Sequence, residues 1–291
     1  MQEGGGLMVG DLRAVTVIVP ALNAAATIGT QLSALSAQTF EGSWEVIVAD
    51  NGSTDNTREV VQGFAGQLPN LRLIDASATR GAGAARNAAA NDATGALLCF
   101  CDADDVVDEA WIESLVKASD YWDFIAGRLD VTSLNDSRTQ LWSPTPEGAR
   151  QHESVRWAAS GNMAMTSALF AELGGFDPDY LKGEDVDLSK RAIAAGHAIG
   201  FCPEALVSYR YRNTLRGIAQ QGYRTGRGGA QACRAGMRPN RSVQTTIKDW
   251  LWLVARSPYV CSASRRGLWV RRATEAAGRV VGSMRYRQRF L

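Results

Sequence analysis

The 291-residue sequence has no apolar stretch long enough to cross a bilayer as a helix. Such a helix needs about 20 apolar residues, whereas the best apolar stretches, such as residues 251–254, extend for about one turn. The five cysteines show no CxxC or zinc-type spacing, which argues against a disulfide framework. Residues 1–13 are rich in glycine and lack the basic start and apolar centre of a signal peptide. We therefore expect a cytoplasmic protein with reduced thiols, which begins with a flexible leader over residues 1–13.

Acidic residues are nearly absent from the C-terminal part of the chain. Residues 205–291 contain 18 Lys and Arg but only 2 Asp and Glu, whereas residues 1–204 contain 13 and 28. The overall net charge of +1 therefore combines an acidic part with a strongly basic one. Apolar residues recur at helical spacing between the arginines, so we expect a basic helical extension over residues 213–291.

Three uses of the basic extension remain open. It could pack on the acidic part of the chain, or stay solvated, or adsorb to an anionic membrane surface with Trp250, Trp252 and Trp269 at the interface. Nucleic-acid binding is not expected, because no nucleic-acid motif accompanies the charge.

Four apolar runs alternate with helical patterns in the first part of the chain. They cover residues 14–19, 44–49, 71–74 and 96–101. Continuous apolar runs are typical of strands that are buried on both faces in a parallel sheet. The order predicts an α/β fold with a mostly parallel, doubly wound sheet. Weaker strand patterns follow at residues 121–125, 158–165 and 205–212.

Polar side chains follow three of these runs, at 20–23, 50–55 and 102–105. The carboxyl ends of parallel strands converge on one crevice, where ligands bind. Carboxylate and amide groups in the first two segments could accept hydrogen bonds from a base or a ribose. The third segment contains Asp102, Asp104 and Asp105, which could hold a hard divalent cation, Mn²⁺ or Mg²⁺, that bridges a diphosphate.

Five segments, in their order and at their intervals, resemble the family 2 glycosyltransferases of the GT-A fold. They read VTVIVPALNAAATI, VIVADNGSTDNT, RGAGAARNAAANDATG, LLCFCDADD and GEDVDLSKRAIAAG. The resemblance implies a GT-A glycosyltransferase domain over residues 14–212, with a nucleotide-sugar half (14–108) and an acceptor half (109–212). It also implies an inverting transfer of a sugar from a nucleoside-diphosphate sugar, UDP-sugar first and GDP-sugar second, to an acceptor hydroxyl.

The resemblance assigns roles only where residues match. Asp102 and Asp104 match the DxD motif, in which Asp102 faces the ribose and sugar and Asp104 ligates the cation. Asp185 matches the general base and Glu184 its neighbour in the ED pair, which together are expected at the catalytic site. Residues expected at the nucleotide sugar are Pro20, Ala21, Asn23, Asp50, Asn51, Arg80, Gly81, Arg86, Asp102, Ala103, Arg210 and Arg212. Residues expected at the acceptor are Gly161, Asn162 and Glu184.

The chain departs from the family pattern at two places. Asn51 stands where many members carry a second Asp, and we expect this to change contacts with the base more than catalysis. Arg210 or Arg212 falls where many members carry a His that contacts metal or diphosphate. Because arginine is always protonated and cannot ligate a metal, we expect one of these side chains to touch the diphosphate.

Two other classes of protein remain as alternatives. A sugar-phosphate nucleotidylyltransferase usually has a Gly-rich signature with a Lys near the first strand, whereas this chain has no Lys before Lys117. A non-catalytic nucleotide-sugar-binding protein of the same fold would be expected to lose Asp104 or Asp185, and both are present. The acidic segments also fit plain helix caps and turns, and Arg80 and Arg86 fit surface charges.

The basic extension favours one kind of acceptor. Phosphorylated, lipid-linked and membrane-proximal glycans all lie where cations concentrate. We therefore expect a glycan or lipid-linked acceptor and a peripheral position at the inner face of the plasma membrane.

Overall fold

The computed structural model describes residues 14–143, 157–180, 182–234, 236 and 241–287, so the expected leader, residues 1–13, lies outside the described residues. The strands are β1 (Val15–Ala21), β2 (Trp44–Asp50), β3 (Leu71–Asp75), β4 (Leu97–Cys101), β5 (Val106–Val107), β6 (Phe124–Asp130), β7 (Asn162–Thr166) and β8 (Gly200–Ser208). The helices of the first 200 residues are α1 (Ile28–Ser36), α2 (Thr57–Gln62), α3 (Ala82–Asn91), α4 (Trp111–Ala118), α5 (Ser137–Trp142), α6 (Ser167–Glu172) and α7 (Glu184–Ala194). The C-terminal helices are α8 (Leu215–Arg234), α9 (Val243–Ala255), the 3₁₀ helix η2 (Ser257–Cys261) and α10 (Arg266–Tyr286).

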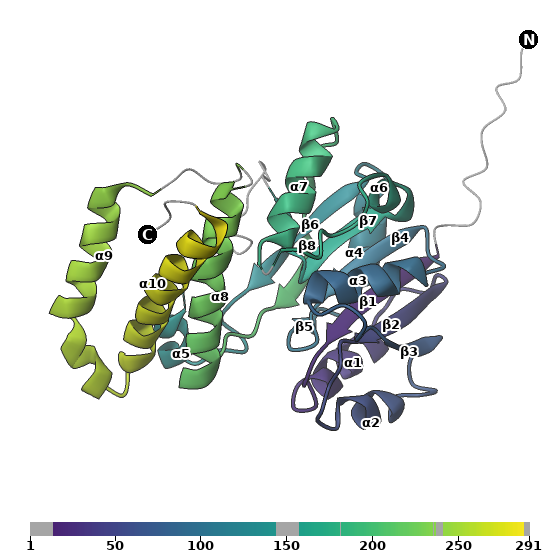
Figure 1. The fold of residues 1–291 in the computed structure, drawn as a ribbon. Coiled ribbons are helices and arrows are strands. Elements are labelled where there is room, and N and C mark those ends of the chain that lie inside the picture. The colour runs from purple at the N-terminus through teal and green to yellow at the C-terminus, as the bar shows by residue number, and fades with distance from the viewer. Residues whose placement is uncertain (1–13, 144–156, 181, 235, 237–240, 288–291) are drawn as a thin grey trace, which may run out of the picture.

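The strands that the structure describes form one sheet in the order β3-β2-β1-β4-β7-β6-β8-β5. The first four strands of this order are parallel, as the alternating sequence pattern predicts. Strand β7 then runs antiparallel to β4 and to β6, whereas β8 is parallel to β6. The predicted α/β fold with its doubly wound sheet is therefore confirmed, and the second half makes the sheet mixed (Figure 1).

Both faces of the sheet are buried, which explains the continuous apolar runs. Val17 and Val19 of β1 pack with Leu32 of α1 on one face, whereas Ile18 packs with Ala85 of α3 on the other. Each fully buried Val, Leu or Ile side chain contributes about 1.5–3 kcal/mol relative to an exposed one. Apolar residues at every position of the strand therefore stabilise the folded state.

The strands of the second half begin and end elsewhere than the sequence pattern indicates. The strand expected at 121–125 begins only at Phe124, because the backbone N–H groups of Tyr121 and Trp122 still donate to the Ala118 carbonyl at the end of α4. The pattern at 205–212 corresponds to β8, which ends at Ser208, and the pattern at 158–165 corresponds to β7. All five cysteines are free thiols, as expected.

The C-terminal helices α8 and α10 lie side by side, apart from the main part of the sheet (Figure 1). Glycines allow their backbones to approach closely. A Cβ on Gly226 would lie 2.0 Å from the Glu275 carbonyl oxygen, and one on Gly278 would lie 2.2 Å from the Tyr223 carbonyl oxygen. The predicted helical extension is confirmed over the described residues, and none of their helices has the length and apolar character needed to span a bilayer.

Candidate active site

The loops after β1 and β2 are tied to each other by polar side chains. The Asn23 amide oxygen accepts from the Thr54 N–H at 2.8 Å, and the Asn23 N–H donates to Ser53 Oγ at 2.9 Å. Asp50 is fully buried and accepts from the Ser53 N–H at 3.1 Å and from Arg58 Nε at 2.6 Å. The structure therefore brings Asn23 and Asp50, both predicted to line the nucleobase pocket, to one edge of the sheet.

Asn51 holds the chain that follows β3. Its amide nitrogen donates to the carbonyl oxygens of Ala76 at 2.6 Å and Thr79 at 2.8 Å, and its amide oxygen accepts from the Gly81 N–H at 2.8 Å. A carboxylate could accept the third hydrogen bond but could not donate the first two. Asparagine at this departure from the family pattern therefore has a structural reason.

Replacing Asn51 by aspartate should lower the free energy of unfolding by about 1–3 kcal/mol, because the carbonyl groups of buried Ala76 and of Thr79 lose their donor. Urea denaturation measures this loss. The matched control is Asn56→Asp at the exposed start of α2, where the change should stay within about 0.5 kcal/mol. Equal stability of the two variants would contradict the role given to Asn51.

Other residues predicted at the donor lie around this edge. Pro20 and Ala21 close β1, and the Ala21 carbonyl oxygen accepts from the Asn51 N–H at 2.8 Å. Arg80 is exposed, and Gly81 precedes α3 with φ of 131°, a value that disfavours other residues. Ala103 is buried between the two aspartates of the DxD sequence.

Two of the carboxylates that follow β4 are engaged by arginines from distant parts of the chain. Asp102 Oδ1 accepts from Arg86 Nη2 of α3 at 2.5 Å. Asp104 Oδ2 lies 2.6 Å from Arg212 Nη1, and burial raises the pKa of Asp104 while the charge of Arg212 opposes that rise. Arg210 Nε donates to the Asp104 carbonyl oxygen at 2.8 Å. Arg210 and Arg212, one of which is expected at the position of the family's His, thus both contact Asp104.

Asp105 is the least satisfied of these carboxylates. Its Oδ1 accepts from the Arg210 N–H at 2.7 Å, whereas its buried Oδ2 has no hydrogen-bond partner among the described residues. Burial raises the pKa of Asp105 well above its usual value, and the charges of Asp102 and Asp104 add to this effect. Asp105 belongs to the acidic segment that the sequence indicates as a possible cation site, although the resemblance to the family gives it no separate role.

The acidic residues fit a hard divalent cation that takes only a minority of its ligands from protein. The carboxylates are buried and repel one another, and Asp105 has an oxygen without a hydrogen-bond partner among the described residues. Mn²⁺ or Mg²⁺ prefers oxygen ligands and would offset this repulsion. Among the described residues no group of three or more Asp, Glu, His or Cys side chains is arranged to hold a metal ion by itself. The remaining ligands would have to come from a diphosphate and from water.

Asp185 lies in the first turn of α7, after Gly183 at φ of 93°. Burial raises the pKa of Asp185 to about 6, and the charge of Glu184 adds to this rise. Hydrogen bonds from the backbone N–H groups of Val186, at 2.8 Å, and of Ser160 oppose it. A carboxyl group with a pKa near 6 can accept a proton at neutral pH more readily than an ordinary aspartate.

Arg86 connects the DxD aspartates with the ED pair. Its side chain is only 2% exposed, and its Nη1 lies 3.5 Å from Glu184 Oε1 while Nη2 binds Asp102. The guanidinium also lies over the ring of Phe176, 5.5 Å from its centroid. The structure thus brings Asp102 and Glu184 to opposite sides of one buried cation. Nothing in the sequence pattern indicates the contact with Phe176.

The two residues predicted at the floor of the acceptor site lie beneath Asp102. A Cβ on Gly161 would lie 2.9 Å from Asp102 Oδ2, so only glycine leaves room for this carboxylate. Asn162 is fully buried, and its amide nitrogen donates to the carbonyl oxygens of Arg128 and Ala205 while its oxygen accepts from Trp111 Nε1. These hydrogen bonds hold Asn162 and the start of β7 in place. Contact of the Asn162 side chain with an acceptor would require breaking them.

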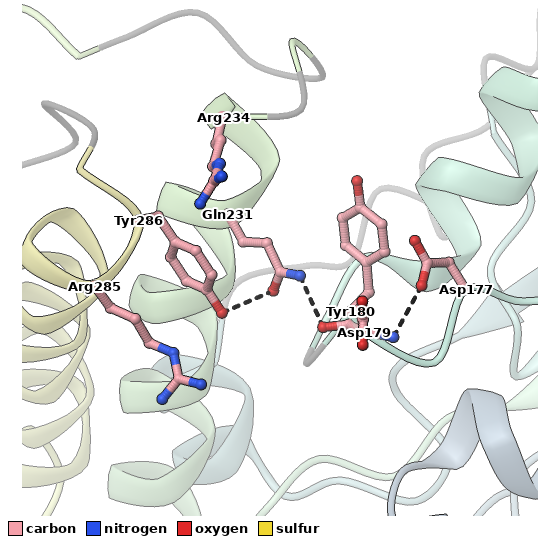
Figure 2. A pocket seen from close by; sticks show the side chains of 7 residues that line it. All are labelled: Asp177, Asp179, Tyr180, Gln231, Arg234, Arg285 and Tyr286. Atoms are coloured by element: carbon pink, nitrogen blue, oxygen red, sulfur yellow. Dashed lines mark hydrogen bonds between the residues drawn. The ribbon is translucent and has the colours of Figure 1, made fainter.

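A cavity of about 560 Å³ lies where the helical extension meets the loop before α7 (Figure 2). It is lined by Asp177, Asp179, Tyr180, Gln231, Arg234, Arg285 and Tyr286. Gln231 Nε2 donates to the Asp179 carbonyl oxygen at 2.7 Å, and Tyr286 donates to Gln231 Oε1 at 3.2 Å. Helix α8 thus contacts the segment that leads to Asp185, and α10 supports this contact through Tyr286.

Comparisons with known proteins find a matching family and similar sequences. The family described as Glycosyl transferase family 2 matches residues 16–171. Glycosyltransferase AglE of Haloferax volcanii is 30% identical over 233 residues, which are 77% of this chain and 75% of AglE.

Two solved structures have a similar fold. The mannosyltransferase PcManGT from Pyrobaculum calidifontis, in complex with GDP-Man and Mn²⁺, has a TM-score of 0.60 and 22% identity over 96% of this chain and 78% of its own. TarS 1–349 of S. aureus, in complex with UDP-GlcNAc, has a TM-score of 0.57 and 18% identity over 94% of this chain and 92% of its own. At these identities the likeness shows the fold alone.

Proposed function

Because the chain belongs to glycosyltransferase family 2 and is a glycosyltransferase, we propose that it is an inverting enzyme that moves a sugar from a nucleoside-diphosphate sugar to an acceptor hydroxyl. One observation carries this proposal. Buried Arg86 binds both Asp102 of the DxD sequence and Glu184 of the Glu184–Asp185 pair, which supports one site for the proposed donor-binding group and the proposed proton acceptor.

Asp185 is proposed as the general base. An inverting transfer needs a base that removes the proton of the acceptor hydroxyl while its oxygen attacks the anomeric carbon from the face opposite the leaving diphosphate. The new glycosidic bond forms as the bond to the diphosphate oxygen breaks, and the diphosphate leaves with the electron pair. A pKa near 6 leaves Asp185 ionised at neutral pH and keeps it a stronger base than an exposed aspartate.

Asp104 and Asp102 are proposed to hold the donor's diphosphate and sugar. A divalent cation on Asp104, when bound, neutralises charge on the diphosphate and so helps it to leave. Arg212 already lies against Asp104 and is more than half exposed. In the presence of a donor, Arg210 or Arg212 would then contact the diphosphate, and Arg86 would hold Asp102 and Glu184 in place.

The donor is proposed to be a UDP-sugar, with a GDP-sugar as the second choice. Both donor classes occur among the similar structures, since one contains GDP-Man and the other UDP-GlcNAc. Asn23, Asp50 and Asn51 are proposed to line the nucleobase pocket at the edge of β1 and β2. The hydrogen bonds of Asn23 to Thr54, of Asp50 to Ser53 and of Asn51 to Gly81 hold the loops after β1, β2 and β3 at this edge.

The acceptor is proposed to be a glycan, carried on a lipid or close to a membrane at its cytoplasmic side. The charge of the extension supports this, because residues 205–291 hold 18 Lys and Arg against 2 Asp and Glu. Gly161 and Glu184 are proposed to face the acceptor.

A thermal-shift screen of UDP, GDP, dTDP and CDP, each with and without Mn²⁺, tests the donor proposal. A ligand that binds only the native state at 100 times its Kd adds about 2.7 kcal/mol to the free energy of unfolding. We expect UDP with Mn²⁺ to give the largest shift. Absence of any shift with all four nucleotides would contradict the proposed function.

A further inference from the structure

Helix α9 carries a row of large apolar side chains on its outer surface. Their exposed fractions are 74% for Val243, 53% for Ile247, 47% for Trp250, 63% for Leu251 and 72% for Val254. Val243, Ile247, Trp250 and Val254 follow one another at intervals of four, three and four residues, and Leu251 lies four residues after Ile247 and three before Val254, so all five lie on one side of the helix. We call these five residues the α9 apolar row.

The opposite face of α9 is the one that contacts the protein. Asp249 binds Arg279 of α10 at 3.0 Å, and the Leu253 carbonyl oxygen accepts from Trp269 Nε1 at 3.0 Å. Leu253 is the buried residue of this helix. A surface helix of a soluble protein normally turns its apolar stripe inward and its charges outward. Helix α9 has the reverse arrangement, and it is the outermost helix of the extension (Figure 1).

Four exposed cations lie in α9 and in the segment that runs from its C-terminal end into α10. Lys248, Arg256, Arg265 and Arg272 are exposed, and none has a carboxylate within 4.0 Å among the described residues. The extension cannot neutralise them itself, because both of its carboxylates are already bound by other arginines. Asp249 pairs with Arg241 and Arg279, and Glu275 pairs with Arg271 and Arg279.

The three tryptophans of the extension differ in their contacts. Trp250 belongs to the α9 apolar row, whereas Trp252 packs against Tyr259 with ring centroids 6.1 Å apart and lies beneath Arg272. Trp269 points toward α9 through its hydrogen bond. Of the three tryptophans only Trp250 is therefore part of the exposed apolar surface.

We propose that α9 lies in the surface of an anionic lipid bilayer. The α9 apolar row would lie among the acyl chains, and the four exposed cations would lie at the lipid headgroups. An amphipathic helix of this kind sinks its apolar side about 5–10 Å into the headgroup and acyl boundary. The cations select a negatively charged surface, which a bilayer with anionic lipids offers over its whole area. Binding of α9 to a bilayer would bring the active site to acceptors carried in the membrane. This inference rests on the proposed function, which it extends.

Flotation of the full-length protein with lipid vesicles tests the proposal. Binding to phosphatidylcholine vesicles that contain phosphatidylglycerol should be at least about tenfold stronger than to phosphatidylcholine alone. The variant Ile247→Ser, Leu251→Ser, Val254→Ser should lose about tenfold or more of the binding to the anionic vesicles. The matched control is Tyr121→Ser with Ile193→Ser, which removes exposed apolar side chains of the catalytic domain and should bind like wild type.

Two outcomes would overturn the proposal. The triple variant could bind anionic vesicles as well as wild type, or the wild type could fail to bind them and instead form a dimer in light scattering that the triple variant abolishes. The second result would make the α9 apolar row a contact between copies of the chain. Release of nucleoside diphosphate from the donor sugar in solution, without vesicles, should be equal in wild type and triple variant. If neither protein released nucleoside diphosphate, this would count against the proposed function and leave the vesicle result standing.

Discussion

Sugar transfer should fall by about 10²–10⁴-fold when Asp185 is replaced by asparagine, because an amide cannot take the proton of the acceptor hydroxyl. The affinity for the nucleoside diphosphate should stay nearly unchanged, since Asp185 is proposed to contact the acceptor hydroxyl and not the nucleotide. Turnover and nucleotide titration on the same preparation measure the two quantities. The matched control is Glu109→Gln, an acid-to-amide change at an exposed residue, which should transfer at the wild-type rate.

The pKa of Asp185 gives this prediction a pH dependence. Burial and the charge of Glu184 raise that pKa to about 6. Because the base must be ionised, kcat/KM of the wild type should fall about tenfold for each pH unit below about 6 and level off above it. The Asp185→Asn variant should lack this limb. Turnover equal to wild type, or an unchanged acid limb in the variant, would contradict the role of Asp185.

Replacing Asp104 by alanine should abolish the part of nucleotide affinity that depends on a divalent cation. Loss of even a supporting group at a metal site lowers affinity by about 10–100-fold, so loss of the proposed ligand should cost at least about tenfold. Nucleotide binding without metal should stay the same or become stronger, because Arg212 loses its carboxylate partner at 2.6 Å and is free to meet the diphosphate. Titration with and without Mn²⁺ measures both values. If Mn²⁺ raised the nucleotide affinity of the variant as much as that of wild type, Asp104 would be ruled out as the ligand.

The first half of the fold could be predicted because its strands are buried on both faces. Val17 and Ile18 point to opposite faces of the sheet and meet separate cores, so the sequence shows an uninterrupted apolar run. The second half gives a weaker signal. Tyr121 and Trp122 look like part of a strand, but they are 83% and 42% exposed and lie in the turn after α4, where their N–H groups donate to the Ala118 carbonyl oxygen. Strand β5 has only two residues, which is too short for any periodicity.

The residues of the candidate site could be named from their types and order, but most of their contacts could not. Asn51 binds the carbonyl oxygen of Thr79 and the N–H of Gly81, which lie 28 and 30 residues later in the chain, and Asn162 is held by Trp111. Such contacts depend on how strands pair and which side chains face inward. The same holds for α9, whose period is visible in the sequence while its outward-facing side is set by the contact of Asp249 with α10.

The most direct test of the account is one titration series with the nucleoside diphosphate selected by the screen, at fixed Mn²⁺, on wild type, Asp104→Ala and Asp185→Asn. The account predicts that wild type and Asp185→Asn bind with the same affinity while Asp104→Ala binds at least about tenfold more weakly. Equal affinity of all three proteins, or equal loss in both variants, would contradict the division of the site into a donor-holding carboxylate and a separate base.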